Sequence, residues 1–191
     1  MTTPIQKHKI YLERKHYSEN MNPISSLVFV FLLTVFPTQI LCQTPLIEST
    51  CGSTIYKVLC LGTLVPDDEA RSATDVKILA KVALRHTVDE ASDVDTHIVK
   101  LKDSTKEGPL KDALSSCSDY YLLVVEKLQA AQTSFQYSGL HVVKGWMKEA
   151  TVYRQKCDQV FQGKPFTSPM SESTTKLSKM QNNAEVIIGL I

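Results

Sequence analysis

Two groups of side chains carry the residue types of a metal or acid–base site. Asp93 and His97 are four residues apart, so on a helix they would lie one turn apart and could hold a metal ion together. Two ligands make a poor metal site, so a solvated helix face is the simpler interpretation. The run Asp67–Glu69 has the carboxylates of an acid–base pair, but it lies in a predicted turn, where acidic residues are common.

No catalytic motif is present in the 191 residues. The sequence lacks the G-x-S-x-G elbow, the zinc motif H-E-x-x-H, the P-loop and the dinucleotide fingerprint. Its seven glycines are too few for phosphate-cradling loops. His86 and His97 are eleven residues apart, which separates them by about 16 Å along a helix, too far to share a metal. We therefore predict that the protein is not an enzyme and needs neither a cofactor nor a metal.

Four cysteines remain as disulfide candidates once Cys42, at the end of an N-terminal apolar run, is set aside. Cys51, Cys60, Cys117 and Cys157 are an even number, which suits a secreted chain, and they allow three pairings. Pairing by neighbourhood joins Cys51 to Cys60 and Cys117 to Cys157, and the second bridge would close a loop of about 40 residues. A zinc site is disfavoured because no C-x-x-C spacing occurs and no histidine clusters with the thiols.

Residues 1–43 are interpreted as an N-terminal extension and signal peptide. The run Leu27–Phe36 is uncharged and apolar, is too short to span a bilayer comfortably, and is followed by Pro37. Cleavage is expected near Cys42 to Thr44, where small and polar residues begin. Residues 1–20 are long and basic for the start of a signal peptide, and Met21 would be a more ordinary first residue. A membrane anchor or a buried helix is the alternative interpretation of the apolar run.

Residues 44–191 are then one domain by length. Four of the 21 basic and two of the 20 acidic residues lie in residues 1–43, so the remaining chain has a formal charge of −1. A nearly neutral chain has no electrostatic footprint for nucleic acid and no basic patch for an anionic membrane. We therefore predict a secreted protein that binds no nucleic acid and, after signal cleavage, no membrane.

Apolar residues recur every three or four positions in four segments, as they do in amphipathic helices. The segments are Val76–Leu101, Leu110–Ala131, Leu140–Val160 and Leu177–Ile191. Ser72 and Thr74 are the predicted N-caps of the first segment. The run Gln132–Gly139 is predicted to be a polar break between the second and third segments. No stretch alternates as a strand would.

The fold class that follows is all-α, an up-down-up-down four-helix bundle preceded by a disulfide-linked helical hairpin. A short link makes the second and third segments antiparallel, so Cys117 and Cys157 lie at matching heights and a bridge between them is geometrically sensible. Two short helical turns flank Gly52 and Ser53 at the start of the domain. A link between Cys51 and Cys60 would hold these turns together as a hairpin.

Several short motifs follow one another in a fixed order along the domain. Cys51 and Cys60 come first, then Ala73-Thr-Asp-Val-Lys-Ile-Leu-Ala80, then Ala113-Leu-Ser-Ser-Cys117-Ser-Asp-Tyr-Tyr121, then Trp146 eleven residues before Cys157. Together, these motifs resemble the plant invertase and pectin methylesterase inhibitors, over roughly Thr44 to Ile191. The resemblance implies the four-helix bundle, the bridges Cys51–Cys60 and Cys117–Cys157, and an inhibitory function.

The resemblance implies a secreted, monomeric protein that caps the active site of a plant carbohydrate-active enzyme in a 1:1 complex. The target implied is a plant pectin methylesterase or an acid invertase, with pectin methylesterase as the broad label. The implied location is the apoplast or cell wall, with the vacuole as a second possibility. A non-inhibitory extracellular helical binding module is the alternative function.

Leu140, His141, Val142 and Trp146 are the candidate partner-binding residues. Invertase inhibitors of this family carry Pro-Lys-Phe at the turn before the third bundle helix, and the matching positions here are Leu140, His141 and Val142, so the motif is not kept. Trp146 matches a position in the pectin methylesterase inhibitors. By its residue type, Trp146 is either a core residue of the bundle or a partner-facing anchor, since tryptophan is enriched at interface hot spots.

Overall fold

The computed structural model describes residues 45–191. This part of the chain contains seven helices, joined by short turns and loops, and no strand. The helices are α3 (Pro45–Gly52), α4 (Lys57–Leu64), α5 (Asp68–Arg71), α6 (Val76–Ser104), α7 (Pro109–Tyr137), α8 (Leu140–Val160) and α9 (Ser171–Gly189). The predicted N-terminal extension and signal peptide lie outside the described residues. None of the helices in residues 45–191 combines the length and the apolar character that crossing a membrane requires.

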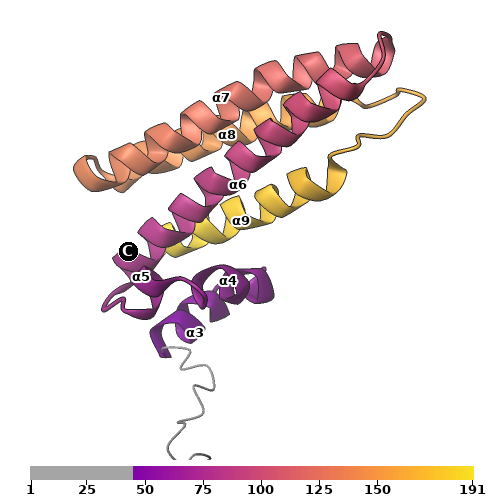
Figure 1. Cartoon of the computed structure of the whole chain (residues 1–191). Helices are drawn as coiled ribbons and strands as arrows, with labels where there is room; N and C mark the ends of the chain where they lie inside the picture. The colour runs from indigo at the N-terminus through magenta and orange to yellow at the C-terminus, as the bar shows by residue number, and fades with distance from the viewer. Residues whose placement is uncertain (1–44) are drawn as a thin grey trace, which may run out of the picture. The chain divides into compact units, whose positions relative to one another are not determined.

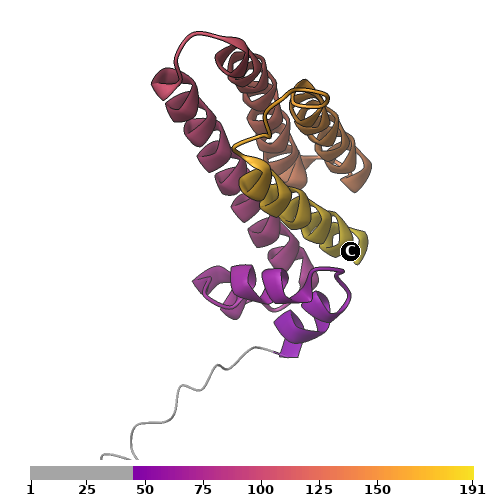
Figure 2. The same cartoon turned by 90° about the vertical axis from the view of Figure 1, so that its right-hand side faces the viewer.

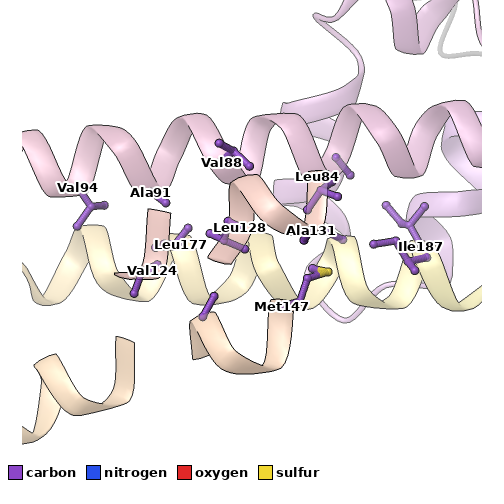
Figure 3. Packing of buried hydrophobic residues seen from close by; sticks show 14 of the residues in the cluster. Leu84, Val88, Ala91, Val94, Val124, Leu128, Ala131, Met147, Leu177 and Ile187 are labelled. Atoms are coloured by element: carbon purple, nitrogen blue, oxygen red, sulfur yellow. The ribbon is translucent and has the colours of Figure 1, made fainter. Parts of the chain in front are cut away.

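Helices α6 to α9 run alternately up and down and pack around one core (Figures 1 and 2). Each of the four contributes a stripe of buried apolar side chains, which confirms the predicted four-helix bundle. Figure 3 shows this core, in which the labelled residues include Leu84, Val88, Leu128, Met147 and Leu177.

The short helices α3 and α4 form the predicted hairpin, and the Cys51–Cys60 bridge joins them with a Cα–Cα distance of 5.5 Å. The hairpin is covered by the bundle, because it packs on α6 and α9 and buries Leu64 almost completely. Tyr56, between its two helices, is held to α9 at both backbone groups. The Tyr56 N–H donates to Asn183 Oδ1 (3.3 Å), and Asn183 Nδ2 donates to the Tyr56 carbonyl (3.1 Å).

Two local predictions at the start of the bundle are wrong. The N-cap of α6 is Asp75, whose carboxylate accepts from the Ile78 N–H at 3.0 Å, and not Ser72 or Thr74. A carboxylate at this position satisfies a free N–H and also complements the helix dipole, so it is at least as good a cap as a hydroxyl. The predicted turn around Asp67–Glu69 is partly helical, because Asp67 caps the short helix α5.

The predicted polar break before the third bundle helix is also wrong over most of its length. Helix α7 continues to Tyr137, since Phe135 extends the apolar stripe and is 5% exposed. Only Ser138 and Gly139 separate α7 from α8. The Cys117–Cys157 bridge joins the two antiparallel helices at a Cα–Cα distance of 4.5 Å. At the chain end, α9 stops at Gly189, so Ile191 is exposed instead of joining the buried face.

Candidate partner-binding surface

Leu140, His141 and Val142 form the first turn of α8, at the tip of the α7–α8 pair. Leu140 and Val142 are half-buried, and Leu140 packs against the core, whereas the His141 side chain is exposed. The His141 ring lies so close to Gly139 that a Cβ at residue 139 would stand 2.9 Å from Nδ1. Tyr137, on the other side of the turn, is 84% exposed. The tip therefore presents an imidazole and a phenol on a tight turn between two bundle helices.

The tip lies beside the end of the chain. Lys144 Nζ is 4.0 Å from the position that a Cβ on Gly189 would take, and Figures 1 and 2 both place the start of α8 near the end of α9. Leu190 and Ile191 are each about half exposed there, at 47% and 48%. Tyr137, Leu190 and Ile191 thus give this end of the bundle exposed apolar surface, which is typical of protein-binding sites.

Trp146 lies one turn beyond Val142 and is neither fully buried nor fully exposed. Its side chain is half-buried and packs against the core, but the fully buried position beside it belongs to Met147. Lys127 of α7 places Nζ 5.1 Å from the Trp146 ring centroid and also pairs with Glu126 (2.9 Å). The hydrogen bond to Glu126 is the main cause that raises the pKa of the Lys127 ammonium. A charged lysine over the indole is a cation–π contact at the protein surface.

A second lysine–aromatic contact lies farther along the same helix pair. Lys156 Nζ lies 5.0 Å from the ring centroid of Tyr153 and 5.8 Å from that of Tyr120. The five residues Tyr120, Lys127, Trp146, Tyr153 and Lys156 form a surface that we name the lysine–aromatic strip. Tryptophan and tyrosine are enriched at interface hot spots, whereas lysine is depleted, so the aromatic rings of the strip are its candidate anchors.

The strip was only partly predicted from the sequence. Trp146 is a candidate from the sequence and Tyr153 lies within the predicted amphipathic segment Leu140–Val160, whereas nothing in the sequence analysis marks Tyr120, Lys127 or Lys156 as binding residues. A signal was present, because Trp146 and Tyr153 are seven residues apart on one helix and Tyr120 and Lys127 are seven apart on the other. Seven residues make two helical turns, so each pair shares a face.

The acidic run in the predicted turn has a structural role that the sequence did not reveal. Asp67 Oδ2 accepts from Arg85 Nη2 (2.5 Å) and lies 2.9 Å from His86 Nε2, while Glu69 pairs with Lys81 (2.8 Å) and Arg85 (2.6 Å). We name these five residues the α5 ion-pair network. Burial alone would raise the pKa of Asp67, but hydrogen bonds from the Ala70 N–H, His86 and Arg85 lower it overall. The network fastens α5 to α6.

The Asp93–His97 pair is exposed on α6. Within residues 45–191, no group of three or more histidine, cysteine or acidic side chains is arranged to hold a metal ion. A broad groove of 1510 Å³ runs between α4, α6 and α9 instead, and two apolar side chains of the hairpin, Ile55 and Val58, are 74% and 85% exposed beside it. The groove is a second concave surface of the bundle, separate from the tip.

Comparisons with known proteins agree on one family. The family model described as plant invertase/pectin methylesterase inhibitor matches residues 45–187. A cell wall/vacuolar inhibitor of fructosidase 2 from Arabidopsis thaliana is 29% identical over 149 residues, which cover 72% of this chain and 79% of the relative. A putative pectinesterase/pectinesterase inhibitor 26 from Arabidopsis thaliana is 23% identical over 150 residues, covering 73% of this chain but only 15% of that protein.

Solved structures show the same fold. The crystal structure of mutant form A of a pectin methylesterase inhibitor from Arabidopsis has a TM-score of 0.64 at 17% identity, and the match covers 76% of this chain and 96% of that one. A second structure, a pectin methylesterase inhibitor from Arabidopsis thaliana, has a TM-score of 0.54 at 17% identity, with coverages of 75% and 92%.

Proposed function

Because the chain belongs to the plant invertase/pectin methylesterase inhibitor family, we propose that it inhibits a plant pectin methylesterase or acid invertase by covering the active-site cleft in a 1:1 complex. The family match over residues 45–187 is the observation that carries this proposal. The family consists of inhibitor proteins, so the chain is an inhibitor and not an enzyme. The chain then contributes no catalytic group and inhibits by placing a surface of fixed shape over the active-site cleft of the enzyme.

The bundle is well suited to present such a surface. Cys117–Cys157 ties the two helices that carry the tip and the lysine–aromatic strip, and Cys51–Cys60 closes the hairpin. A preformed surface loses little conformational entropy when it binds, so more of the contact energy is available for affinity. We propose that Leu140, His141, Val142 and Trp146 contact the enzyme, together with the rest of the strip.

Two target enzymes are proposed, each supported by a different observation. The relative that is 29% identical is named an inhibitor of fructosidase, and it favours an acid invertase as the first enzyme to test. Trp146 and the pectinesterase inhibitor relative favour pectin methylesterase as the second. We also propose that residues 44–191 are the mature inhibitor domain, secreted as a monomer to the cell wall, or delivered to the vacuole, after removal of residues 1–43.

The experiment is a paired inhibition assay. The oxidised mature chain is titrated into a plant pectin methylesterase and into cell-wall and vacuolar invertases, each between about pH 5 and 7. Loss of activity in one enzyme at a stoichiometry of one inhibitor per enzyme is the expected result. Full activity of all of them at inhibitor excess would contradict the proposal and leave the non-inhibitory binding module as the function.

The tip is tested in the same assay with matched histidine variants. We expect His141→Ala to weaken inhibition because His141 is exposed at the tip, and His97→Ala to leave it unchanged. His97 is also exposed but lies far from the tip, because it is about 32 Å along α6 from Val76, which begins this helix at the same end of the bundle as the tip. Trp146→Ala is expected to weaken inhibition about 30-fold, as for a hot-spot tryptophan worth about 2 kcal/mol. Circular dichroism shows whether each variant is folded, and equal inhibition by all three variants would remove the tip from the interface.

A further inference from the structure

A polar trough of 340 Å³ lies where the first half of α9 meets α8 and Tyr56 of the hairpin. Three hydroxyl groups of α9, those of Ser171, Thr175 and Ser178, follow one another along it at spacings of four and three residues, so they share one face of the helix. None of the three makes a side-chain hydrogen bond within residues 45–191. The trough therefore carries a row of hydroxyl donors and acceptors that the fold leaves free.

Charged groups stand on both sides of this hydroxyl row. On the α8 side, Arg154 Nη1 donates to Asp158 Oδ2 at 3.1 Å, and the buried Nε of Arg154 has no hydrogen-bond partner in the described part of the chain. On the hairpin side, Lys179 Nζ lies 5.6 Å from the Tyr56 ring centroid. No carboxylate among residues 45–191 forms an ion pair with Lys179. The trough thus combines one paired arginine with one lysine that lacks a counter-ion.

The walls of the trough are fixed before any ligand arrives. Tyr56 is held by its two hydrogen bonds with Asn183, and the Arg154 side chain is only 12% exposed. Ser168, in the loop before α9, accepts from the Met170 N–H at 3.3 Å. Such preorganisation is what a weak polar ligand needs, because little ordering cost is added on binding.

The donor and acceptor pattern points to a class of ligand. Sugar rings offer several adjacent hydroxyls, each both donor and acceptor, which match the hydroxyl row and the Arg154–Asp158 pair. The lysine without a counter-ion matches a single carboxylate on such a ring. Phosphate suits the trough less well, because it concentrates its charge on one centre that the nearby Asp158 carboxylate would repel, whereas a uronate ring can place its carboxylate at Lys179 and its neutral hydroxyls beside Asp158. We propose that the trough binds an oligosaccharide that contains uronate residues.

This site lies apart from the proposed inhibitory tip, because Arg154 is 14 residues beyond Leu140 on the same helix, about 21 Å along the axis. It is level with Tyr153 and Lys156 of the lysine–aromatic strip, but Lys156 contacts Tyr120 of α7, whereas Arg154 lines the trough with residues of α9. The proposal does not depend on which enzyme is inhibited, and saccharide binding is measured without any enzyme. A bundle with both sites could bind its enzyme at the tip while holding an acidic polysaccharide on its flank.

The test is a nuclear magnetic resonance titration of the oxidised mature chain, labelled with ¹⁵N, with trigalacturonate, its fully methyl-esterified form and inorganic phosphate. We expect trigalacturonate to shift the amide signals of residues around Ser171 to Lys179, and the esterified form to bind more weakly. Lys179→Met should weaken binding about ten-fold, which corresponds to 1.4 kcal/mol. Lys148→Met, which removes an exposed lysine of α8, should leave it unchanged and is the matched control.

A second variant separates the sugar contacts from the charge. Thr175→Ala combined with Ser178→Ala keeps the charge and should weaken both trigalacturonate and its ester. Absence of shifts at about 10 mM trigalacturonate, shifts confined to other faces, equal loss in the two lysine variants, or stronger binding of phosphate would each overturn the proposal. Because inhibition is assayed separately, failure here leaves the proposed inhibitory function untouched.

Discussion

Replacing Asp67 tests whether the α5 ion-pair network fixes the start of the bundle. The Asp67 side chain is 11% exposed, and its partners Arg85 and His86 are 34% and 31% exposed, so the network lies between a surface pair and a buried one. Surface pairs contribute at most about 1 kcal/mol, whereas breaking a buried pair costs about 3–5 kcal/mol. We therefore expect Asp67→Asn to lower the free energy of unfolding at pH 7 by about 2 kcal/mol.

The same residue has a second role that a second variant isolates. Asp67 Oδ1 accepts from the Ala70 N–H at 3.0 Å, and an asparagine can keep this cap whereas an alanine cannot. Asp67→Ala should therefore cost about 1 kcal/mol more than Asp67→Asn. Urea unfolding of the three proteins measures both differences, and 2 kcal/mol corresponds to a midpoint shift of about 1 M if the urea dependence is about 2 kcal/mol per molar.

The pH dependence gives the sign of the effect. The pKa of Asp67 is lowered below its ordinary value of 3.8 in the folded state, so the ionised form stabilises the fold above that value. This stability is lost as the pH falls through the folded-state pKa and the carboxylate takes up a proton. The gap between wild type and Asp67→Asn should therefore be full at pH 7 and should narrow as the pH falls below 3.8. Asp68→Asn, a change at a side chain that is 90% exposed, is the control and should behave as wild type. An Asp67→Asn variant as stable as wild type at pH 7, or a gap that does not narrow as the pH falls below 3.8, would refute the reasoning.

Three further predictions concern the bridges, the core and the tip. Replacing both cysteines of the Cys117–Cys157 bridge with alanine should lower the free energy of unfolding by about 4 kcal/mol, and the same change at Cys51–Cys60 should lower it by about 2.7 kcal/mol. The costs differ because the bridges join residues 40 and 9 positions apart. Equal urea midpoints for the two double variants would show that loop length does not set the cost. Met147→Ala should cost about 2–5 kcal/mol in the same experiment, since the side chain is fully buried, and a cost below 1 kcal/mol would mean that the core collapses onto the cavity. Gly139→Ala should displace the His141 ring and weaken inhibition with little change in stability, because φ at Gly139 is −67° and suits any residue; unchanged inhibition would count against a contact by His141.

The bundle was predictable because it depends on periodicity. In α6 to α9, the apolar residues spaced by three and four positions are nearly all buried. Tertiary packing therefore agrees with the helical pattern that the sequence predicts. The extra length of α7 was predictable in principle, since Phe135 stands four residues after Ala131 on the same stripe. The polar residues between them favour a break in the sequence, although polar residues on the solvent face are normal in an amphipathic helix.

Helix starts were less predictable, for a physical reason. Ser72, Thr74 and Asp75 are all good N-caps, and propensity cannot choose among three candidates within four residues. The choice is made by α5, which ends at Arg71 with Ser72 as its C-cap, so that residue already belongs to the preceding helix. The position of α5 depends in turn on its N-cap, Asp67, and a prediction that places Asp67 in a turn does not include this short helix.

The lysine–aromatic strip shows how much more can be predicted from the sequence once one long-range contact, the Cys117–Cys157 bridge, is known. A bridge between Cys117 and Cys157 locks two antiparallel helices at one height, so residues equally far from it in opposite directions lie opposite one another. Tyr120 follows Cys117 by three residues and Tyr153 precedes Cys157 by four, while Lys127 and Trp146 are ten and eleven residues away. The bridge alone therefore predicts both contacts of the strip along the helix axis. The bridge does not predict that these side chains face solvent, because the positions of α6 and α9 decide which side of the α7–α8 pair is exposed. Any interface formed by the strip therefore depends on how α6 and α9 pack.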